Sequence, residues 1–432
     1  MDVSTSSRPA ERGLARTLTL PGAIALALGI CLGAGLLILT GLAYQRSGNA
    51  AIYTWLIEGV MLLPMLAILA YLGTAHSSAA GVAGIARTAF GPAAGSAVQA
   101  LLIGTFSLGL PGISIVGGNY FAFLVGGGRH TALFASAGML VLTCWLNVRG
   151  VRVSGAVQRI MTFSLVTIVA LGALAGLLFA SHDAGSGIAP LEDWQTALPS
   201  LGITFFAFTG FILVASTVEE YKNAARDYPR AIFITFGIAF CLYLLIALAI
   251  QLTLSRTDPR VGAAPVAAML SVVLGPVSGK LAAAVGVLVI TTNLNGATWG
   301  FSRLVMASAR SGLLPAALST VDARTQVPMY AVVTSTSLFL VTLACYAAEI
   351  TSLPTLLSLA GQNFFVLYMI CVVSFVRIVP ALWLRLVGAI LLLGYVVRLI
   401  SYQNKLAYPI ALICAGAILH HVKARVLRSS TS

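Results

Sequence analysis

The sequence predicts an all-α polytopic membrane protein with twelve transmembrane helices. Of its 432 residues, 59% are hydrophobic and only 9% are charged, and the mean hydropathy is +0.98. Long apolar runs alternate with short polar segments, and an apolar helix of about 20 residues crosses a bilayer. A soluble chain has no use for so much apolar surface. The net charge of +13 comes from basic residues scattered singly between the runs, so it indicates topology and no nucleic-acid partner.

The expected spans are read from the apolar runs and their charged boundaries. The first six cover residues 18–43, 51–72, 95–126, 131–148, 154–180 and 197–218. The second six cover residues 230–253, 278–301, 327–347, 353–378, 381–399 and 404–421. The apolar piece 261–277 is too short to span and contains two prolines, so we expect it to form a partly buried loop helix on the outer side.

The basic residues predict the orientation of the chain. With the N-terminus inside, 18 of the 25 Lys and Arg residues fall on the cytoplasmic side and 7 on the outer side. Cytoplasmic loops carry the excess of basic residues in membrane proteins. We therefore expect two cytoplasmic tails, residues 1–17 and 422–432, in agreement with an even number of spans.

The cysteines and histidines predict no metal site and no cofactor. The 6 cysteines lie within apolar runs, and no pair of them has the spacing of metal ligands. The 5 histidines lie in loops or at the ends of spans, and the sequence has no nucleotide-binding or zinc-protease motif. A membrane-embedded enzyme is therefore disfavoured.

Two spans contain glycines at the depth where a helix is most weakened. Gly33 and Gly35 lie in the middle of the first span, and Gly210 follows Thr209 in the sixth. Interrupted helices at corresponding positions point to a transporter built from inverted repeats. The repeats would be residues 18–180 and 197–378, with residues 379–421 forming helices 11 and 12 outside them. The alternative is that these glycines only allow close helix packing.

A charged segment carries a family resemblance. Residues 220–231, Glu-Tyr-Lys-Asn-Ala-Ala-Arg-Asp-Tyr-Pro-Arg-Ala, resemble a hallmark of amino acid–polyamine–organocation (APC) permeases, with Ala224 where the family usually has proline. The glycine-broken first span, residues 80–91 and residues 206–211 (Phe-Ala-Phe-Thr-Gly-Phe) are similar to the same family, as are Arg303 and residues 309–315. The resemblance covers about residues 18–378. Within the family, this charged segment and residues 109–111 (Gly-Leu-Pro) look closest to bacterial exporters of methionine and branched-chain amino acids.

The resemblance implies a LeuT-like 5+5 inverted repeat with discontinuous helices 1 and 6. The carboxylate of a substrate would meet the backbone N–H groups freed at the first break, and its ammonium would meet carbonyls freed at both breaks. Apolar side chains of spans 3, 6 and 8 would form the walls, although such a stripe also suits ordinary packing. Asn293 and Asn295 of span 8 would line the site or bond across helices. The expected substrate-site residues are Cys31, Gly33, Ala34, Gly35, Phe106, Leu110, Phe206, Ala207, Phe208, Thr209, Gly210, Asn295 and Trp299.

Charged residues suggest how transport would be coupled and gated. Glu58 is an acidic residue within the second expected span and is the candidate for proton coupling, because a buried carboxylate is costly within a membrane. The alternative, which we favour, is that Glu58 faces water near the outer end of the span. The charged segment at the inner mouth would form a gate or simply a solvated loop. The candidates for that gate are Glu220, Lys222, Arg226, Asp227 and Arg230.

Together these features predict a secondary active transporter in a bacterial inner membrane. We expect it to export leucine, isoleucine, valine or methionine by alternating access, driven by a proton gradient and without a cofactor. Uptake by symport, amino acid exchange, and a passive channel or receptor are the alternatives. The expected partners are the amino acid and the lipid bilayer, and both a monomer and a homodimer are open.

Overall fold

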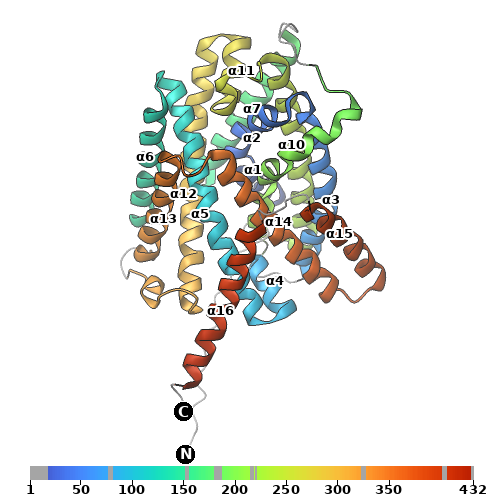
Figure 1. Cartoon of the computed structure of the whole chain (residues 1–432), viewed down its shortest axis with the longest axis vertical. Coiled ribbons are helices and arrows are strands. Elements are labelled where there is room, and N and C mark those ends of the chain that lie inside the picture. Colours follow the sequence, from blue (N-terminus) through green and yellow to red (C-terminus); the bar gives the residue numbers. More distant parts are fainter. Residues whose placement is uncertain are drawn as a thin grey trace, which may run out of the picture.

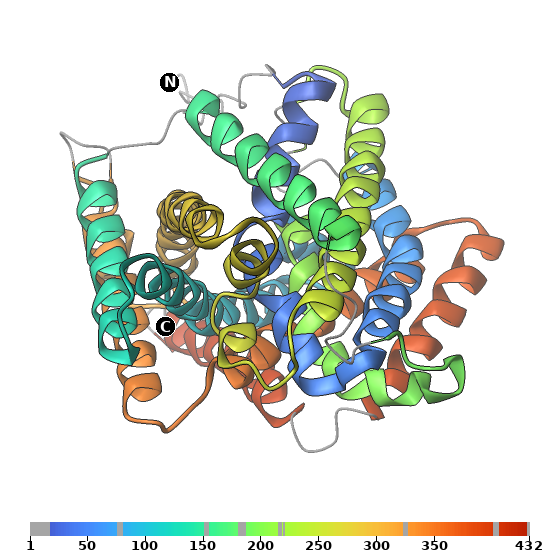
Figure 2. The same ribbon diagram turned by 90° about the horizontal axis from the view of Figure 1, so that it is seen from above.

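The computed structural model describes residues 18–75, 81–150, 155–179, 187–214, 218, 221–322, 327–400 and 406–429. Within this part of the chain nearly all regular structure is helical, and long helices pack side by side (Figure 1). Helices α6 (Arg129–Val148) and α13 (Met329–Ala347) lie at one edge of the bundle, and α15 (Leu382–Ile400) lies at the opposite edge in both ribbon views (Figures 1 and 2).

Besides the 3-10 turn η1 (Gly48–Ala50), the first half of the chain supplies eight α-helices and one further 3-10 segment. They are α1 (Leu20–Cys31), α2 (Ala34–Ser47), α3 (Ala51–Ala75), α4 (Gly81–Phe90), α5 (Pro92–Val125), α6, α7 (Gly155–Phe179), η3 (Leu191–Ser200) and α8 (Leu201–Thr204). The second half supplies η4 (Phe205–Phe208), α9 (Gly210–Val214), α10 (Ala224–Thr253), η6 (Pro259–Gly262), α11 (Pro265–Leu274), α12 (Pro276–Arg310), α13, α14 (Leu353–Ile378), α15 and α16 (Ala407–Ser429).

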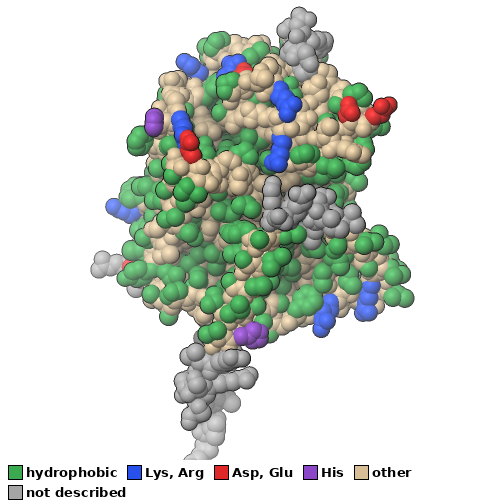
Figure 3. Space-filling model, in the orientation of Figure 1, with side chains coloured by type: hydrophobic (Ala, Val, Ile, Leu, Met, Phe, Trp, Pro, Cys, Tyr) green, Lys and Arg blue, Asp and Glu red, His purple; other side chains and the backbone are tan. Residues whose placement is uncertain are grey.

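The described residues contain nine helical stretches that are long and apolar enough to cross a membrane, against the twelve spans expected. The difference has a simple origin. The stretch Ala34–Ala75 combines part of the first expected span with the second, and α1 alone is too short to count. The described parts of α15 and α16, which correspond to the last two expected spans, are also shorter apolar helices. Figure 3 shows hydrophobic side chains over the middle of one face, with most charged side chains nearer its ends. The chain is a multi-pass membrane protein.

Two helix starts differ from the sequence prediction for local reasons. Helix α10 begins at Ala224, six residues before the expected start, because the Asn223 side chain accepts a hydrogen bond from the Arg226 backbone N–H. The short helix α4, which was not predicted as an element, is separated from α5 by Gly91, whose φ of 90° ends one helix before Pro92 opens the next.

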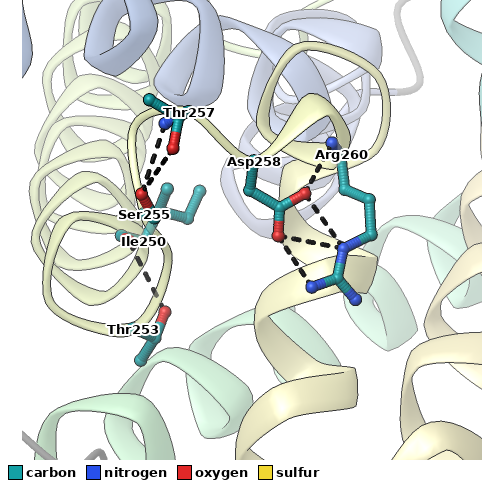
Figure 4. Close-up of polar contacts among 6 residues, drawn as sticks. All are labelled: Ile250, Thr253, Ser255, Thr257, Asp258 and Arg260. Carbon is teal, nitrogen blue, oxygen red and sulfur yellow. Dashed lines mark hydrogen bonds and ion pairs between the residues drawn. The ribbon is translucent and has the colours of Figure 1, made fainter.

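The predicted loop helix is present as η6 and α11. The first six residues of α11 are buried, whereas its last turn is partly exposed. The preceding loop is closed by an ion pair in which the Arg260 guanidinium donates to both carboxylate oxygens of Asp258, the shortest distance being 2.7 Å (Figure 4). This hydrogen bonding lowers the pKa of Asp258 below its usual range, although partial burial opposes the shift.

Candidate substrate-binding site

The first expected span is broken, as predicted. Helix α1 ends at Cys31, and α2 begins at Ala34 after Gly33, whose ψ of −134° turns the chain out of the helical conformation. The first backbone N–H groups of α2 have no partner within the helix, and the positive end of its dipole lies behind them. This helix start can bind a carboxylate, provided that a substrate reaches it.

The sixth expected span is also interrupted, but here by a 3-10 turn within the helix. The short helix α8 passes into the 3-10 turn η4, and the helix resumes at Gly210. The Phe206 carbonyl accepts from both the backbone N–H and the hydroxyl of Thr209, at 3.3 and 2.8 Å. The Phe208 carbonyl accepts from the Tyr368 hydroxyl at 2.8 Å. Two of the backbone carbonyls that were expected to bind the ammonium of the substrate therefore already accept hydrogen bonds within the protein.

The two interruptions touch each other. A β-carbon on Gly210 would lie 2.9 Å from the Cα and 2.8 Å from the Sγ of Cys31, closer than real contacts allow. A β-carbon on Gly35 would lie 3.6 Å from the Cα of Ala207. Glycine is thus required at Gly210 for the last turn of α1 and the start of α9 to approach this closely.

The aromatic side chains of the second interruption face different neighbours. Phe206 forms an edge contact with Phe364 of α14, with the ring centroids 6.3 Å apart. Phe364 also forms an edge contact with Phe106 of α5, at 5.7 Å. Phe208 instead packs with Trp55 of α3 and Tyr243 of α10, at 6.2 and 5.6 Å. Both Phe206 and Phe208 were expected to contribute to the apolar walls. In the structure Phe206 shares the neighbour Phe364 with Phe106, whereas Phe208 faces α3 and α10.

Leu110, the other expected wall residue of span 3, is buried on α5, one residue beyond Gly109. A β-carbon on Gly109 would lie 3.3 Å from the ring of Phe206, so this part of α5 runs directly beside the second interruption. The sequence analysis did not name Phe364, which joins Phe106 to Phe206; it lies within an apolar run that gave no sign of its direction.

Tyr243 is a second residue that the sequence analysis did not single out. Its ring stacks on Trp55 with the centroids 4.5 Å apart, and its hydroxyl is buried without a hydrogen-bond partner among the described residues. A β-carbon on Gly35 would lie 2.9 Å from this hydroxyl oxygen. The hydroxyl therefore points at the first turn of α2, where the free N–H groups lie.

The asparagines of α12 divide between the two roles considered for them. Asn293 donates to the Gly29 carbonyl of α1 at 3.4 Å, and a β-carbon on Gly33 would lie 2.9 Å from the same amide nitrogen. Asn295 is buried and accepts from the Asn147 amide of α6 at 2.9 Å. Asn295 thus bonds across helices, and Asn293 is the amide of α12 that reaches the first break.

Trp299 lies two turns after Asn293 on α12 and is half-buried. The Arg303 guanidinium carbon lies 3.4 Å from the centroid of its ring, close enough for a strong cation–π contact. One face of Trp299 is therefore occupied by a neighbour on the same helix.

Glu58 is fully buried on α3, with 0% of its surface exposed, so the expectation that it faces water is wrong. Neighbouring helices cover this stretch of α3. Tyr395 of α15 donates to the Met61 carbonyl at 3.2 Å, and a β-carbon on Gly59 would lie 2.2 Å from the ring of Phe240 on α10.

The expected inner gate is only partly described. Glu220 lies outside the described residues; Arg226, Asp227 and Arg230 lie in the first two turns of α10 rather than in a loop. Among the described residues these side chains form no ion pair with one another. Instead, Leu18 forms an isolated bridge with Tyr221, and the Lys222 backbone N–H donates to the Leu18 carbonyl at 3.1 Å. Backbone pairing thus joins the segments that precede α1 and α10.

Titratable side chains do not gather in this region as they would around a metal. Among the described residues, no three His, Cys, Asp or Glu side chains come together as metal ligands would. What the two interruptions offer is backbone donors, backbone acceptors and apolar rings, a combination that suits a zwitterion with an apolar side chain.

A model of the family described as amino acid permease matches residues 18–383. The chain belongs to this family, within the APC superfamily. It is 22% identical over 406 residues to the uncharacterized amino acid permease YecA of Bacillus subtilis, covering 93% of this chain and 95% of that one. It is 25% identical over 299 residues to the L-methionine/branched-chain amino acid exporter YjeH of Escherichia coli, covering 69% and 71%.

The permease also shares its fold with a solved structure, that of MhsT in complex with L-phenylalanine. The TM-score is 0.64 at 14% identity, and the match covers 90% of this chain and 100% of the other. At this identity the likeness concerns the fold alone. The long helices of this chain are therefore arranged as in that structure.

Proposed function

We propose that the permease is a secondary active transporter of small neutral hydrophobic amino acids that works by alternating access. The observation that carries this proposal is the contact between the two interrupted helices at Gly210 and Cys31, within a chain of the amino acid permease family. The start of α2 would bind the carboxylate of the substrate, and carbonyls near the second interruption would bind its ammonium.

The surroundings of the interruptions support leucine, isoleucine, valine and methionine as substrates. The rings of Phe106, Phe206 and Phe364 pack around this region, and an apolar side chain loses no hydrogen bonds when it lies against them. The likeness to an exporter of L-methionine and branched-chain amino acids supports the same choice and also supports export.

The proposal extends to topology. We infer twelve spans, two five-helix inverted repeats at residues 18–180 and 197–378, and helices 11 and 12 at residues 379–421. The excess of basic residues on one side supports cytoplasmic termini, residues 1–17 and 422–432, in a bacterial inner membrane. The driving force would be the proton gradient, with Glu58 as the proton-binding group, and no cofactor would be needed.

The test uses purified protein in liposomes preloaded with labelled leucine or methionine. We expect saturable efflux that responds to a pH gradient and is reduced by unlabelled branched-chain amino acids but not by lysine. Efflux that requires an amino acid outside and ignores the gradient would make the protein an exchanger. Flux that does not saturate would indicate a passive channel, and the absence of flux for every amino acid would overturn the substrate assignment.

A further inference from the structure

A groove of about 530 Å³ lies between α4, α5, α14 and α16, away from the interrupted helices. Every residue that lines it is apolar; Phe90, Ala97, Ile370 and Ile413 represent the four helices. Its volume falls within the range of small-molecule pockets, about 300–1,000 Å³. An apolar groove of this size on a membrane protein is a site for a hydrocarbon chain.

The length of the groove corresponds to one leaflet of a bilayer. Along α16 its lining residues run from Leu406 to Ala417, a rise of roughly 16 Å for a helix, and the hydrocarbon core is about 30 Å thick. Helix α16 is fixed against α5 beside the groove, where a β-carbon on Gly416 would lie 2.7 Å from the Ser96 carbonyl oxygen. The groove is thus bounded by rigid walls.

Two arginine side chains lie at the end of the groove where α4 approaches α5 and α14. The Arg377 guanidinium carbon lies 5.4 Å from the ring centroid of Phe90, a lining residue. Arg87 lies in the last turn of α4, against Gly95 of α5. Both arginines are exposed, and neither forms an ion pair within the described part of the chain.

A histidine of α16 lies near the same end of the groove. His420 follows the lining residue Ala417 by one turn and lies 3.3 Å from the Ser96 hydroxyl. The sequence of α16 continues with Lys423, Arg425 and Arg428. In the orientation proposed above, this end of α16 lies at the membrane face with the excess of basic residues, and clustered Lys and Arg there attract anionic lipid head groups.

We propose that the groove binds one anionic phospholipid of the cytoplasmic leaflet. An acyl chain would fill the apolar channel, and the phosphate would be held by Arg87 and Arg377, with His420 at the edge. A second copy of the chain is a weaker candidate for the groove, because it would have to place acidic side chains against Arg87 and Arg377 to neutralise them. The site is separate from the transport site, so it stands or falls independently of the proposed substrate.

The test measures lipid binding without transport. Purified protein in detergent is titrated with dioleoyl-phosphatidylglycerol or dioleoyl-phosphatidylcholine, which share their acyl chains, and bound lipid is counted by native mass spectrometry. We expect one phosphatidylglycerol to be retained in preference to phosphatidylcholine. The double variant Arg87→Gln/Arg377→Gln should weaken phosphatidylglycerol binding roughly fivefold per arginine removed, the weight of one basic side chain near an anionic surface, and leave phosphatidylcholine unchanged.

Matched variants separate charge from packing. Arg310→Gln removes an exposed cation at the end of α12 and should leave lipid binding unchanged. Ala94→Leu fills the groove and should weaken both lipids, whereas Val141→Leu, on the exposed face of α6, should weaken neither. Thermal midpoints in lipid-free detergent show whether each variant is folded. Equal binding of the two lipids, insensitivity to the double variant, or a lipid-free dimer that Ala94→Leu dissociates would each overturn the proposal.

Discussion

Gly210 is the point at which the second interrupted helix meets the first, and a single methyl group should disturb it. In Gly210→Ala the new β-carbon would lie 2.9 Å from the Cα of Cys31, and backbone atoms cannot move aside cheaply. Such overpacking costs about 1–3 kcal/mol, and it separates the two breaks. We expect amino acid flux in liposomes to fall at least tenfold while the protein remains in the membrane.

Gly296→Ala is the matched control for this change, because a β-carbon on Gly296 of α12 meets nothing within 4 Å. Its flux should equal that of the wild type. Normal transport by Gly210→Ala would mean that the contact with Cys31 is not part of the transport site.

The buried hydroxyl of Tyr243 has no hydrogen-bond partner in the part of the chain that the structure describes. Because that oxygen points at the first turn of α2, it can donate to a carboxylate bound there. A hydrogen bond to a charged group contributes about 1.5–3 kcal/mol, so Tyr243→Phe should raise KM for leucine by roughly tenfold or more. The thermal midpoint of the empty protein should not fall, since no hydrogen bond is lost.

The Tyr228 hydroxyl is likewise buried without a partner among the described residues, beside Gly73 of α3. Tyr228→Phe is therefore the control, and its KM should stay at the wild-type value. An unchanged KM in Tyr243→Phe would reduce this residue to a packing partner of Trp55.

At the scale of elements, α2, the second half of the first interrupted helix, is supported by the loop before α11. A β-carbon on Gly41 of α2 would lie 2.1 Å from the Val261 carbonyl oxygen and 2.6 Å from the ring of Pro265. Gly41→Ala should therefore push η6 and α11 away from α2 and destabilise the protein by about 1–3 kcal/mol. A lower thermal midpoint in detergent would show this, with Gly237→Ala of α10, which has open space, as the control that keeps it.

The loop that carries this support should be sensitive to acid. The pKa of Asp258 is lowered chiefly by the hydrogen bonds from Arg260, so the pair stabilises the fold above the unfolded pKa of about 3.9 and loses this effect as the pH falls through the lower folded value. The Asp258 and Arg260 side chains are 16% and 46% exposed, so the gain is at most about 1 kcal/mol.

Asp258→Asn should accordingly lower the thermal midpoint at pH 7, and its difference from the wild type should shrink as the pH falls below the unfolded pKa of about 3.9 toward the lower folded value. Glu349→Gln, which removes the more exposed pair with Arg129, should change the midpoint less at pH 7. A difference between Asp258→Asn and wild type that stays constant as the pH falls below about 3.9 would show that the loop is held by other contacts.

The sequence predicted where helices break but not where their side chains point. Glycines at mid-span indicate weak points of a helix whatever surrounds them, so both interruptions could be foreseen. The direction of Phe208 could not, because the 3-10 turn advances the chain by a larger angle per residue than an α-helix. The pairing of Asn295 with Asn147 depends on the packing of α12 against α6, which the sequence alone does not specify.

At the scale of the whole molecule, the same reasoning explains why Glu58 was misplaced. Its burial results from the packing of other elements against α3, among them α10, whose Phe240 ring lies against the adjacent Gly59, and α10 is distant from α3 in the sequence. Composition and charge bias were sufficient to predict a multi-pass membrane protein, because both are properties of the chain as a whole. Which helix shields a given acid depends on the assembled bundle.

A carboxyl group enclosed by the bundle is suited to carry a proton when the bundle changes conformation, because its charged form is costly away from water. If Glu58 is this group, Glu58→Gln keeps the size of the side chain and removes the bound proton. We expect the variant to exchange labelled leucine across liposomes at a near-normal rate but to lose acceleration by a pH gradient, so that driven efflux falls to the level without a gradient. Wild-type gradient dependence in Glu58→Gln would leave the residue with a structural role in α3, and loss of exchange as well would mean that the substitution blocks the conformational cycle itself.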